Sequence, residues 1–496
     1  MKTVKKMVCI ITLLACIILL ATCDATTKPD IPDSKNDGNI VLTINGKYAG
    51  FRILGTGIIT IDWGNGKVEE FEVQEEESFP PNTIMYEYRK ASTYTINIYG
   101  DITSFRANNS NIISLDVSKS PNLRYLSCMW NNLTELNVNN NLNLQYLDCS
   151  VNKIANLDVS NNPKLQYLKC NSNNISSLDV TNNHDLQYLS CSFNPMLSLY
   201  INNPLLEELY CNRNALTELD VSKAPSLQRL FCGQNQLTNL DVSYNTQLQT
   251  LNCDVNNITQ LVMNNNNSLV RLFCSSNQLT TIDLSKLASL ESFEAKYNKI
   301  YSLDLSENKA LKWLMLYHNN LQNLDLSQNV KLITLNLNYN QLTAIDLSKN
   351  VNLNGLFIRF NQLSSLDVSQ NINIDFLECT NNQITRLDLR NAERLRSVNC
   401  GDNLLSSVDL STNKGLYSFK GDNNLLTNLN FSENEDILEI SIQNNQMTST
   451  ALNNLFMSLP TSKEYNNNRL FINENPGTST SDKSIAENKG WKFLTE

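Results

Sequence analysis

The sequence predicts a solenoid of 21-residue units, with a small β domain before it and a short α/β segment after it. Three observations predict this fold. A cysteine or another residue of modest size recurs at 21-residue intervals, leucines recur in a fixed phase around it, and an asparagine follows three residues later in every unit. A chain of 496 residues is too long for one compact core, whereas each unit of a repeat array buries its apolar face only against its neighbours.

The first residues have the pattern of an export signal. Residues 1–22 combine early lysines with an apolar run, and Cys23 follows directly. The segment Leu20-Ala21-Thr22-Cys23 resembles a bacterial lipobox, which implies cleavage before Cys23 and lipidation of that cysteine, although Thr22 departs from the usual Gly or Ala. Ordinary cleavage and an uncleaved anchor are the alternatives. The polar, turn-rich residues 23–38 are expected to be a flexible tether.

Residues 39–101 are predicted to form a small β domain, because apolar residues there alternate with a period of two. The segments NIVLTINGKY, IITIDWGNGKVEEFEV and TYTINIYG are strand-like, and Gly64-Asn65-Gly66 predicts a hairpin turn. The order IDWGNG and then YEYRKASTYTINIYG resembles bacterial PKD-like β-sandwich modules. We expect this domain to act as a cap and spacer for the first repeat, and the alternative is a separate binding module.

Residues 102–445 contain the repeats. The unit reads L-x-x-L-x-C-x-x-N-x-L-T-x-L-D-V-S-x-N-x-x, which predicts a leucine-rich-repeat solenoid with parallel strands on its concave face. The asparagine after the cysteine is present in sixteen consecutive units, from Asn131 to Asn445. We expect its side chain to bond backbone groups that are left open where each strand turns.

The cysteines pose a question of chemistry. Ten of the thirteen share one phase, where Ala, Leu, Ile or Gly replaces cysteine in other units. The position therefore favours a buried group of modest volume, and we expect a column of free thiols; in-register parallel strands offer poor geometry for disulfides between turns.

Aspartates form a second column, from Asp116 to Asp409. We expect each to bond a backbone N–H in its turn, and a row of calcium sites is the alternative.

The repeat units with a cysteine ladder resemble bacterial leucine-rich-repeat surface proteins of the internalin J type. The resemblance covers about 340 residues. It implies a surface protein that recognises a protein or glycoprotein, mucin-like glycoproteins among them. Proteins of that type carry a C-terminal cell-wall sorting signal, whereas this chain ends in KGWKFLTE, so a lipid at Cys23 would replace it and would suit an outer membrane.

The end of the chain, residues 446–496, breaks the 21-residue period. The segments TSTALNNLFMSLP, RLFINENPGTST and DKSIAENKGWKF predict an amphipathic helix, a strand, a turn, a second short helix and a final aromatic strand. We expect this α/β segment to cap the last repeat.

Aromatic and arginine residues mark the candidate binding face. Strand residues between the buried leucines are expected to face the concave surface, where Tyr125, Tyr146, Tyr167 and Tyr188 form an early column. The residues predicted to contact a ligand share large flat side chains or guanidinium groups: Tyr210, Phe231, Phe273, Trp313, Tyr317, Phe357, Phe376, Arg229 and Arg271. Such side chains dominate binding energy at interfaces and stack on sugars. The structural alternative is that stacked rings stabilise neighbouring turns.

Composition narrows the function. A net charge of −10 without a basic stripe disfavours nucleic acid and anionic lipid as partners. The only histidines, His184 and His318, lie in different repeats, and no nucleophile with a base, phosphate-binding glycine loop or paired carboxylates stand out, so we predict no enzyme and no cofactor or metal.

We therefore predict an exported, lipid-anchored, monomeric surface protein, placed in the outer membrane, that binds a host or bacterial protein or glycoprotein through its concave face. The alternative is a scaffold component of the bacterial envelope that binds another envelope protein or a polysaccharide.

Overall fold

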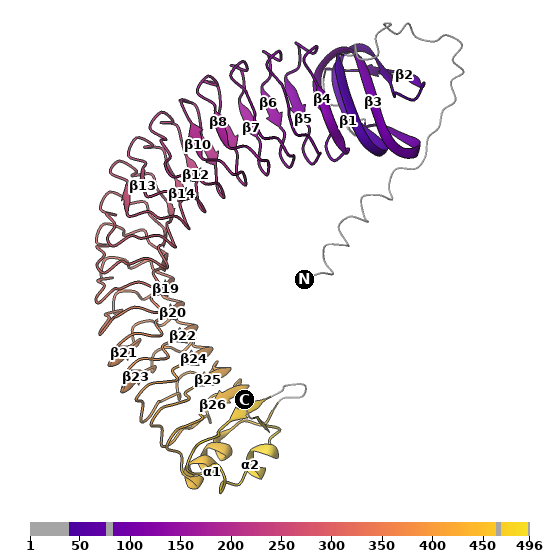
Figure 1. Cartoon of the computed structure of the whole chain (residues 1–496). Helices are drawn as coiled ribbons and strands as arrows, with labels where there is room; N and C mark the ends of the chain where they lie inside the picture. Colours follow the sequence, from indigo (N-terminus) through magenta and orange to yellow (C-terminus); the bar gives the residue numbers. More distant parts are fainter. Residues whose placement is uncertain (1–38, 76–82, 463–467, 495–496) are drawn as a thin grey trace.

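The solenoid bends into an open arc with its continuous sheet on the inner side (Figure 1). The computed structural model describes residues 39–75, 83–462 and 468–494, and it has about 18 turns. The export signal, the tether and Cys23 lie outside the described residues. Within the described ranges, no helix has the length and apolar character needed to cross a membrane.

The inner sheet consists of one short strand from each repeat. Neighbouring strands are parallel and in register, so that Leu209 lies beside Leu230 and Leu230 beside Leu251. The middle residue of each strand is buried, and the first and third residues point outward. The sixteen strands are β5 (Tyr125–Ser127), β6 (Tyr146–Asp148), β7 (Tyr167–Lys169), β9 (Tyr188–Ser190), β11 (Glu208–Tyr210), β12 (Arg229–Phe231), β14 (Thr250–Asn252), β16 (Arg271–Phe273), β17 (Ser292–Glu294), β18 (Trp313–Met315), β19 (Thr334–Asn336), β20 (Gly355–Phe357), β22 (Phe376–Glu378), β24 (Ser397–Asn399), β25 (Ser418–Lys420) and β26 (Glu439–Ser441).

A second set of short strands lies half a turn further along some of the repeats. These strands lie at the L-D step of the consensus, where Tyr200 and Val262 replace the aspartate in two units, and they pair in three separate two-stranded sheets. They are β8 (Ser177–Asp179), β10 (Ser198–Tyr200), β13 (Asn239–Asp241), β15 (Gln260–Val262), β21 (Ser365–Asp367) and β23 (Arg386–Asp388).

The strands before the repeats are continuous with the inner sheet. They are β1 (Ile40–Asp62), β2 (Val68–Val73), β3 (Ile84–Arg106) and β4 (Ile112–Asp116). The predicted hairpin is present, since Asp62 pairs with Val68. The end of β3 pairs in parallel with β5, and its Phe105 lies beside Leu126, so that the repeat register begins inside this strand.

The segment after the last repeat also joins the sheet. It contains α1 (Ser449–Ser458), β27 (Arg469–Phe471), α2 (Ser484–Glu487) and β28 (Lys492–Phe493), in the order that the sequence predicts. Thr448 caps α1 by accepting a hydrogen bond from the Ala451 N–H. β27 pairs with β26 and β28 pairs with β27, while both helices lie at this end of the arc (Figure 1).

The asparagine ladder has the predicted mechanism. In the turn that follows β16, Nδ2 of Asn277 donates to the carbonyls of Cys253 at 3.0 Å and Cys274 at 3.1 Å, and Oδ1 accepts from the Ile258 N–H at 2.9 Å. One side chain therefore joins its own turn to the preceding one. Asn475 continues the ladder, because it donates to the carbonyls of Ile442 and Ile472. The prediction stopped at Asn445, although the spacing from Ile472 to Asn475 repeats the cysteine-to-asparagine step.

A second asparagine ladder was not predicted. Asn308 is fully buried, and its Nδ2 donates to the carbonyls of Leu284 and Leu287, both at 3.0 Å. The same bonds recur in most turns, whereas Ala224, Leu287 and Ala392 occupy this phase in others. The ladder asparagines of this second set are Asn141, Asn162, Asn183, Asn203, Asn245, Asn266, Asn308, Asn329, Asn350, Asn371, Asn413 and Asn434.

The cysteine column lies inside the solenoid, as predicted. All ten cysteines of the column are buried free thiols. Burial disfavours the thiolate and raises the pKa of Cys191, Cys232 and Cys400 to about 12. The column therefore consists of unreactive thiols that fill space between turns.

We expect these ten thiols to react with a thiol reagent only after unfolding. In the folded protein at pH 8 they should stay unmodified, because they are excluded from solvent and remain protonated. After unfolding in guanidinium without reductant, all ten should react; recovery of almost none would mean that disulfides join the turns.

A strained residue precedes each ladder asparagine. Sixteen such residues, from Trp130 to Asn444, have φ between 48° and 60°, a conformation that costs L-residues about 1–2 kcal/mol and that Asn tolerates best. Asn381, Asn423 and Asn444 occupy it, but so does the β-branched Val255, with φ 58°.

Replacing Val255 by Asn should therefore stabilise the protein. We expect the free energy of unfolding to rise by about 1 kcal/mol, measured by denaturant titration. Val255 and Val330 are similarly exposed, at 47% and 44%, but Val330 is not among the residues with positive φ. The Val330→Asn control should change stability by less than about 0.5 kcal/mol; equal effects of the two substitutions would contradict the strain argument.

Candidate ligand-binding face

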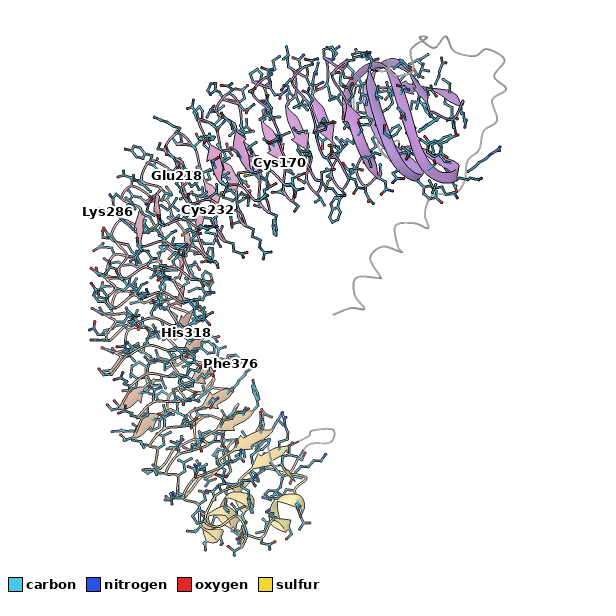
Figure 2. The ribbon with its side chains drawn as sticks, in the orientation of Figure 1. Cys170, Glu218, Cys232, Lys286, His318 and Phe376 are labelled. Carbon is cyan, nitrogen blue, oxygen red and sulfur yellow. The ribbon has the colours of Figure 1, made fainter. Side chains whose placement is uncertain are left out.

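The concave face is defined here as the outward side chains at the first and third positions of the sixteen inner strands. Each strand contributes one side chain to each of two rows that follow the arc. Figure 2 places Phe376 on the inner side of the arc and Lys286 on the outer side. The predicted strand residues therefore lie on one continuous surface.

Six rings lie beside one another at the N-terminal part of this face. The run begins with Tyr125 and Tyr146, stacked at 4.1 Å between ring centroids, and ends with Tyr210 and Phe231, stacked at 5.0 Å. Arg229 forms an ion pair with Glu208, which also accepts a hydrogen bond from the Tyr210 hydroxyl at 2.7 Å. Burial and Glu208 raise the pKa of Tyr210 to about 12, so this hydroxyl stays a donor. The neighbouring turns thus hold these rings in place.

Arg271 and Phe273 occupy the first and third positions of β16. The Arg271 Nε–H donates to Oγ1 of Thr250 at 3.3 Å, which ties the guanidinium to the neighbouring strand. Phe273 is half-buried. Both side chains reach the concave face as predicted. They lie at some distance from the run of six rings.

Trp313 and Phe376 are the most exposed of the predicted rings, at 40% and 39%. The Lys312 ammonium lies 5.8 Å from the Trp313 ring. Phe357 is half-buried on β20, the strand next to β22, which carries Phe376. These large exposed rings on an open sheet have the character of interface residues.

The nine predicted residues do not form one pocket. They extend from β11 to β22, eight strand spacings apart, which corresponds to roughly 40 Å. A small ligand cannot contact all of them, whereas a protein surface or an extended chain can.

Tyr317 lies beyond the end of β18 and not on an inner strand, and it contacts a row of rings that sequence reasoning missed. Tyr297, His318, Tyr339 and Phe360 stack face to face, with centroid separations of 4.4, 4.1 and 4.3 Å, and Tyr317 meets the first of them edge-on at 5.3 Å. Burial and the nearby Arg359 lower the pKa of His318, which favours the neutral ring. The signal in the sequence was an aromatic residue directly before the ladder asparagine in four successive units.

The aspartate column forms turns, as predicted. Oδ1 of Asp304 accepts from the Ser306 N–H at 2.9 Å, and Asp325 and Asp346 do the same with the serine two residues later. These bonds lower the pKa of the three carboxyls. No group of three or more His, Cys, Asp or Glu residues suited to a metal ion is found in the described parts of the chain.

Solved structures similar to this one include bacterial repeat proteins. The functional domain of InlJ from Listeria monocytogenes, which includes a cysteine ladder, is 29% identical with a TM-score of 0.51, and the match covers 77% of each chain. The fold is a leucine-rich-repeat solenoid. A leucine-rich-repeat protein of Leptospira interrogans matches at 23% identity over 73% of this chain and 93% of its own, with a TM-score of 0.56. YopM from Yersinia enterocolitica matches at 22% identity over 75% and 83%, with a TM-score of 0.61.

No protein-family profile matches the sequence of this leucine-rich-repeat solenoid, and no curated protein matches it either. The structural neighbours thus show the fold and the cysteine ladder. Leucine-rich-repeat solenoids of this kind typically serve as non-enzymatic scaffolds for protein interaction, with an extended concave surface for the partner.

Proposed function

We propose that this protein is a lipid-anchored cell-surface recognition protein that binds a protein or glycoprotein through its concave face. The exposed Trp313 and Phe376 rings carry the proposal, because a soluble sheet surface gains nothing in stability from leaving such rings in water. The resemblance of the N-terminus to a lipobox supports anchoring at Cys23 and export to the outer membrane.

The residues that would contact the partner fall into two parts of the face. Around β11 and β12, Tyr210, Phe231 and Arg229 are held by contacts with neighbouring turns, which lowers the entropy cost of binding. Around β18 to β22, the rings of Trp313 and Phe376 are more exposed. A partner roughly 40 Å long would contact both parts.

We also propose that the strands before the repeats and the segment after them cover the ends of the solenoid. The buried rings of Trp63 and Phe105 lie at one end, and Trp491 at the other. Apolar ends would otherwise be exposed to water and promote association.

The test compares two double variants on arrayed extracellular proteins and glycoproteins. Trp313→Ala with Phe376→Ala should weaken binding tenfold or more, about 1.4 kcal/mol. Tyr244→Ala with Tyr301→Ala removes two rings that are even more exposed but lie outside the inner strands, and this control should bind like the parent.

Two results would overturn the proposal. Equal losses in the two double variants would remove the concave face from recognition. If the parent protein binds no extracellular protein but crosslinks to a component of its own envelope, the scaffold function would replace it.

A further inference from the structure

The stacked aromatic row ends in a polar groove at the C-terminal part of the arc. The groove has a volume of about 450 Å³ and is lined by the row that continues past the rings, namely Phe360, Asn381, Asp402, Asn423, Asn444 and Glu474. Every residue of this row has positive φ, so the turns hold their side chains in one line. We propose that this groove is a binding subsite for a neutral oligosaccharide, an inference that rests on the proposed function and gives its recognition surface a ligand class.

Phe360 supplies an apolar wall. One face of its ring stacks on Tyr339 at 4.3 Å with 9° between the planes, and the ring is 39% exposed. The next residue in the row is Asn381, whose side chain is short, so the second face of Phe360 borders the groove. A flat ring held in this way suits the apolar C–H face of a pyranose.

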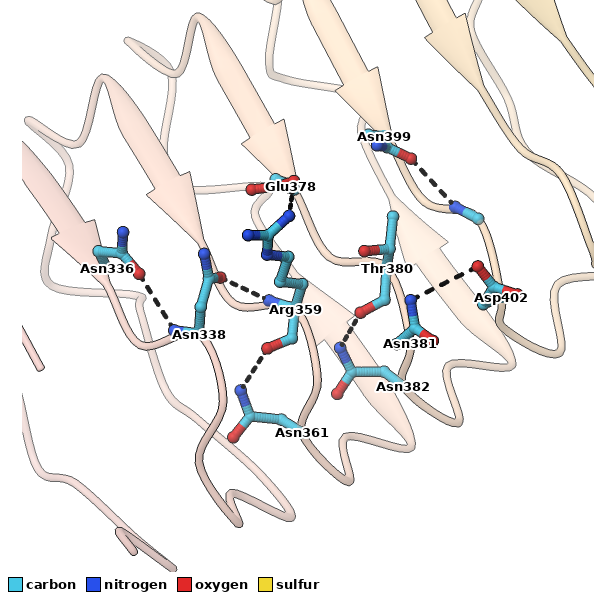
Figure 3. A network of polar contacts seen from close by, with 11 residues as sticks. Asn336, Asn338, Arg359, Asn361, Glu378, Thr380, Asn381, Asn382, Asn399 and Asp402 are labelled. Carbon is cyan, nitrogen blue, oxygen red and sulfur yellow. Dashed lines mark hydrogen bonds and ion pairs between the residues drawn. The ribbon is translucent and has the colours of Figure 1, made fainter. Parts of the chain in front are cut away.

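The polar side chains of the row are already oriented by each other. Nδ2 of Asn423 donates to Asp402 at 2.9 Å, and Nδ2 of Asn444 donates to Oδ1 of Asn423 at 2.9 Å. Nδ2 of Asn381 donates to Asp402 at 3.4 Å (Figure 3). A side-chain amide has two N–H donors and an oxygen with two acceptor sites, so each retains capacity for a ligand. Alternating donors and acceptors match sugar hydroxyls, which both donate and accept.

The groove has depth because the adjacent row carries small residues. Thr380 and Gly401 follow Arg359 there, and both line the groove. Arg359 also lines the groove and forms an ion pair with Glu378 at 3.2 Å (Figure 3). From Asn381 to Asn444 the row spans three turns, roughly 14 Å, which is long enough for more than one sugar ring.

The charge of the groove selects the kind of sugar. Glu378, Asp402, Asp422 and Glu474 contribute four carboxylates, against the two cationic groups of Arg359 and Lys420, and Lys420 also lies 3.4 Å from Glu439. An excess of negative charge repels sialic acids and uronic acids. Neutral hexoses and N-acetylhexosamines are therefore the expected components.

The experiment measures binding of the purified full-length protein to arrayed free di- to tetrasaccharides, neutral and sialylated, without any protein partner. The neutral saccharides should bind, and Phe360→Ala should lower the affinity for them tenfold or more. Tyr297→Ala is the matched control, because Tyr297 ends the same stack on the opposite side, away from the groove, and it should leave binding unchanged.

Asp402→Asn provides a second test that preserves shape. It removes one carboxylate at a position that Asn tolerates, so the affinity for sialylated relative to neutral members should rise severalfold. The inference fails if no neutral saccharide binds, if Phe360→Ala and Tyr297→Ala act alike, or if sialylated members bind best to the parent.

The outcomes of these experiments distinguish failure of the saccharide groove from failure of the proposed protein recognition. Free saccharides that bind while no protein or glycoprotein does so would refute protein recognition and keep the groove. Glycoprotein binding that depends on Trp313 and Phe376, but not on Phe360, together with no free saccharide bound, would refute the groove alone.

Discussion

Asn277→Ala should lower the free energy of unfolding by about 3 kcal/mol or more. The substitution leaves the Ile258 N–H without its side-chain acceptor. It also removes the bonds from Asn277 to the carbonyls of Cys253 and Cys274, which keep their bonds from the neighbouring ladder asparagines. Asn277 is 3% exposed, so water cannot replace it. Leaving the Ile258 N–H unpaired costs about 1–3 kcal/mol, and each lost bond to a carbonyl adds about 0.5–1.5 kcal/mol. Denaturant titration followed by circular dichroism measures the change.

Two further variants define the mechanism. Asn320→Ala changes the exposed asparagine that follows the ladder residue Asn319, and its Nδ2 donates only a long bond of 3.5 Å to the Lys299 carbonyl. This substitution should cost less than about 0.5 kcal/mol. Asn277→Asp keeps the acceptor for Ile258 but places a carboxylate beside two carbonyls, so it should be at least as harmful as Ala. A mild effect of Asn277→Asp would show that donation by Nδ2 is unimportant.

The sequence predicted this ladder because both its spacing and its chemistry are local. The asparagine recurs without exception from Asn131 to Asn445, and its partners are backbone groups of its own and the preceding turn. The buried cysteines and the aspartate turns were predictable for the same reason. Each depends on one position of a regular unit.

Features that depend on contacts between turns, or on backbone shape, were harder to predict. The second asparagine ladder was missed because Ala224, Leu287 and Ala392 interrupt it. Before the repeats, the sequence predicted two separate segments, 39–48 and 58–73, but the first and the start of the second belong to one strand. β1 runs unbroken from Ile40 to Asp62, because irregularities in its pairing with β3, such as that between Leu54 and Gly55, bend the strand without ending it.

The candidate site was predictable only in part. Alternation within each strand placed Trp313 and Phe376 on the concave face, and the structure agrees. The groove beside Phe360 was not foreseeable, because it depends on left-handed backbone at Asn381 and Asp402 and on the small Gly401 in the next row. The phase of the repeat shows which residues share a row. The depth of the groove between two rows follows only from the three-dimensional structure.

Asn308→Ala should cost about 2 kcal/mol, less than Asn277→Ala, although Asn308 is the more deeply buried. Its loss removes one hydrogen bond from each of the carbonyls of Leu284 and Leu287, which still accept from the N–H groups of Leu287 and Leu290. No N–H loses a partner, because within the described residues Oδ1 of Asn308 accepts no hydrogen bond. Removing that buried oxygen recovers part of the loss. The natural occurrence of Ala and Leu at this phase agrees with a smaller penalty.

Asn308→Leu separates the lost hydrogen bonds from the cavity that Ala leaves. Leucine occupies the same phase one turn earlier, at Leu287, so the side chain fits this environment and fills the space. We expect Asn308→Leu to be less destabilising than Asn308→Ala in the same denaturant titration. If Asn308→Ala proved as costly as Asn277→Ala, the two ladders would be equivalent, and the unpaired oxygen of the second would have no energetic consequence.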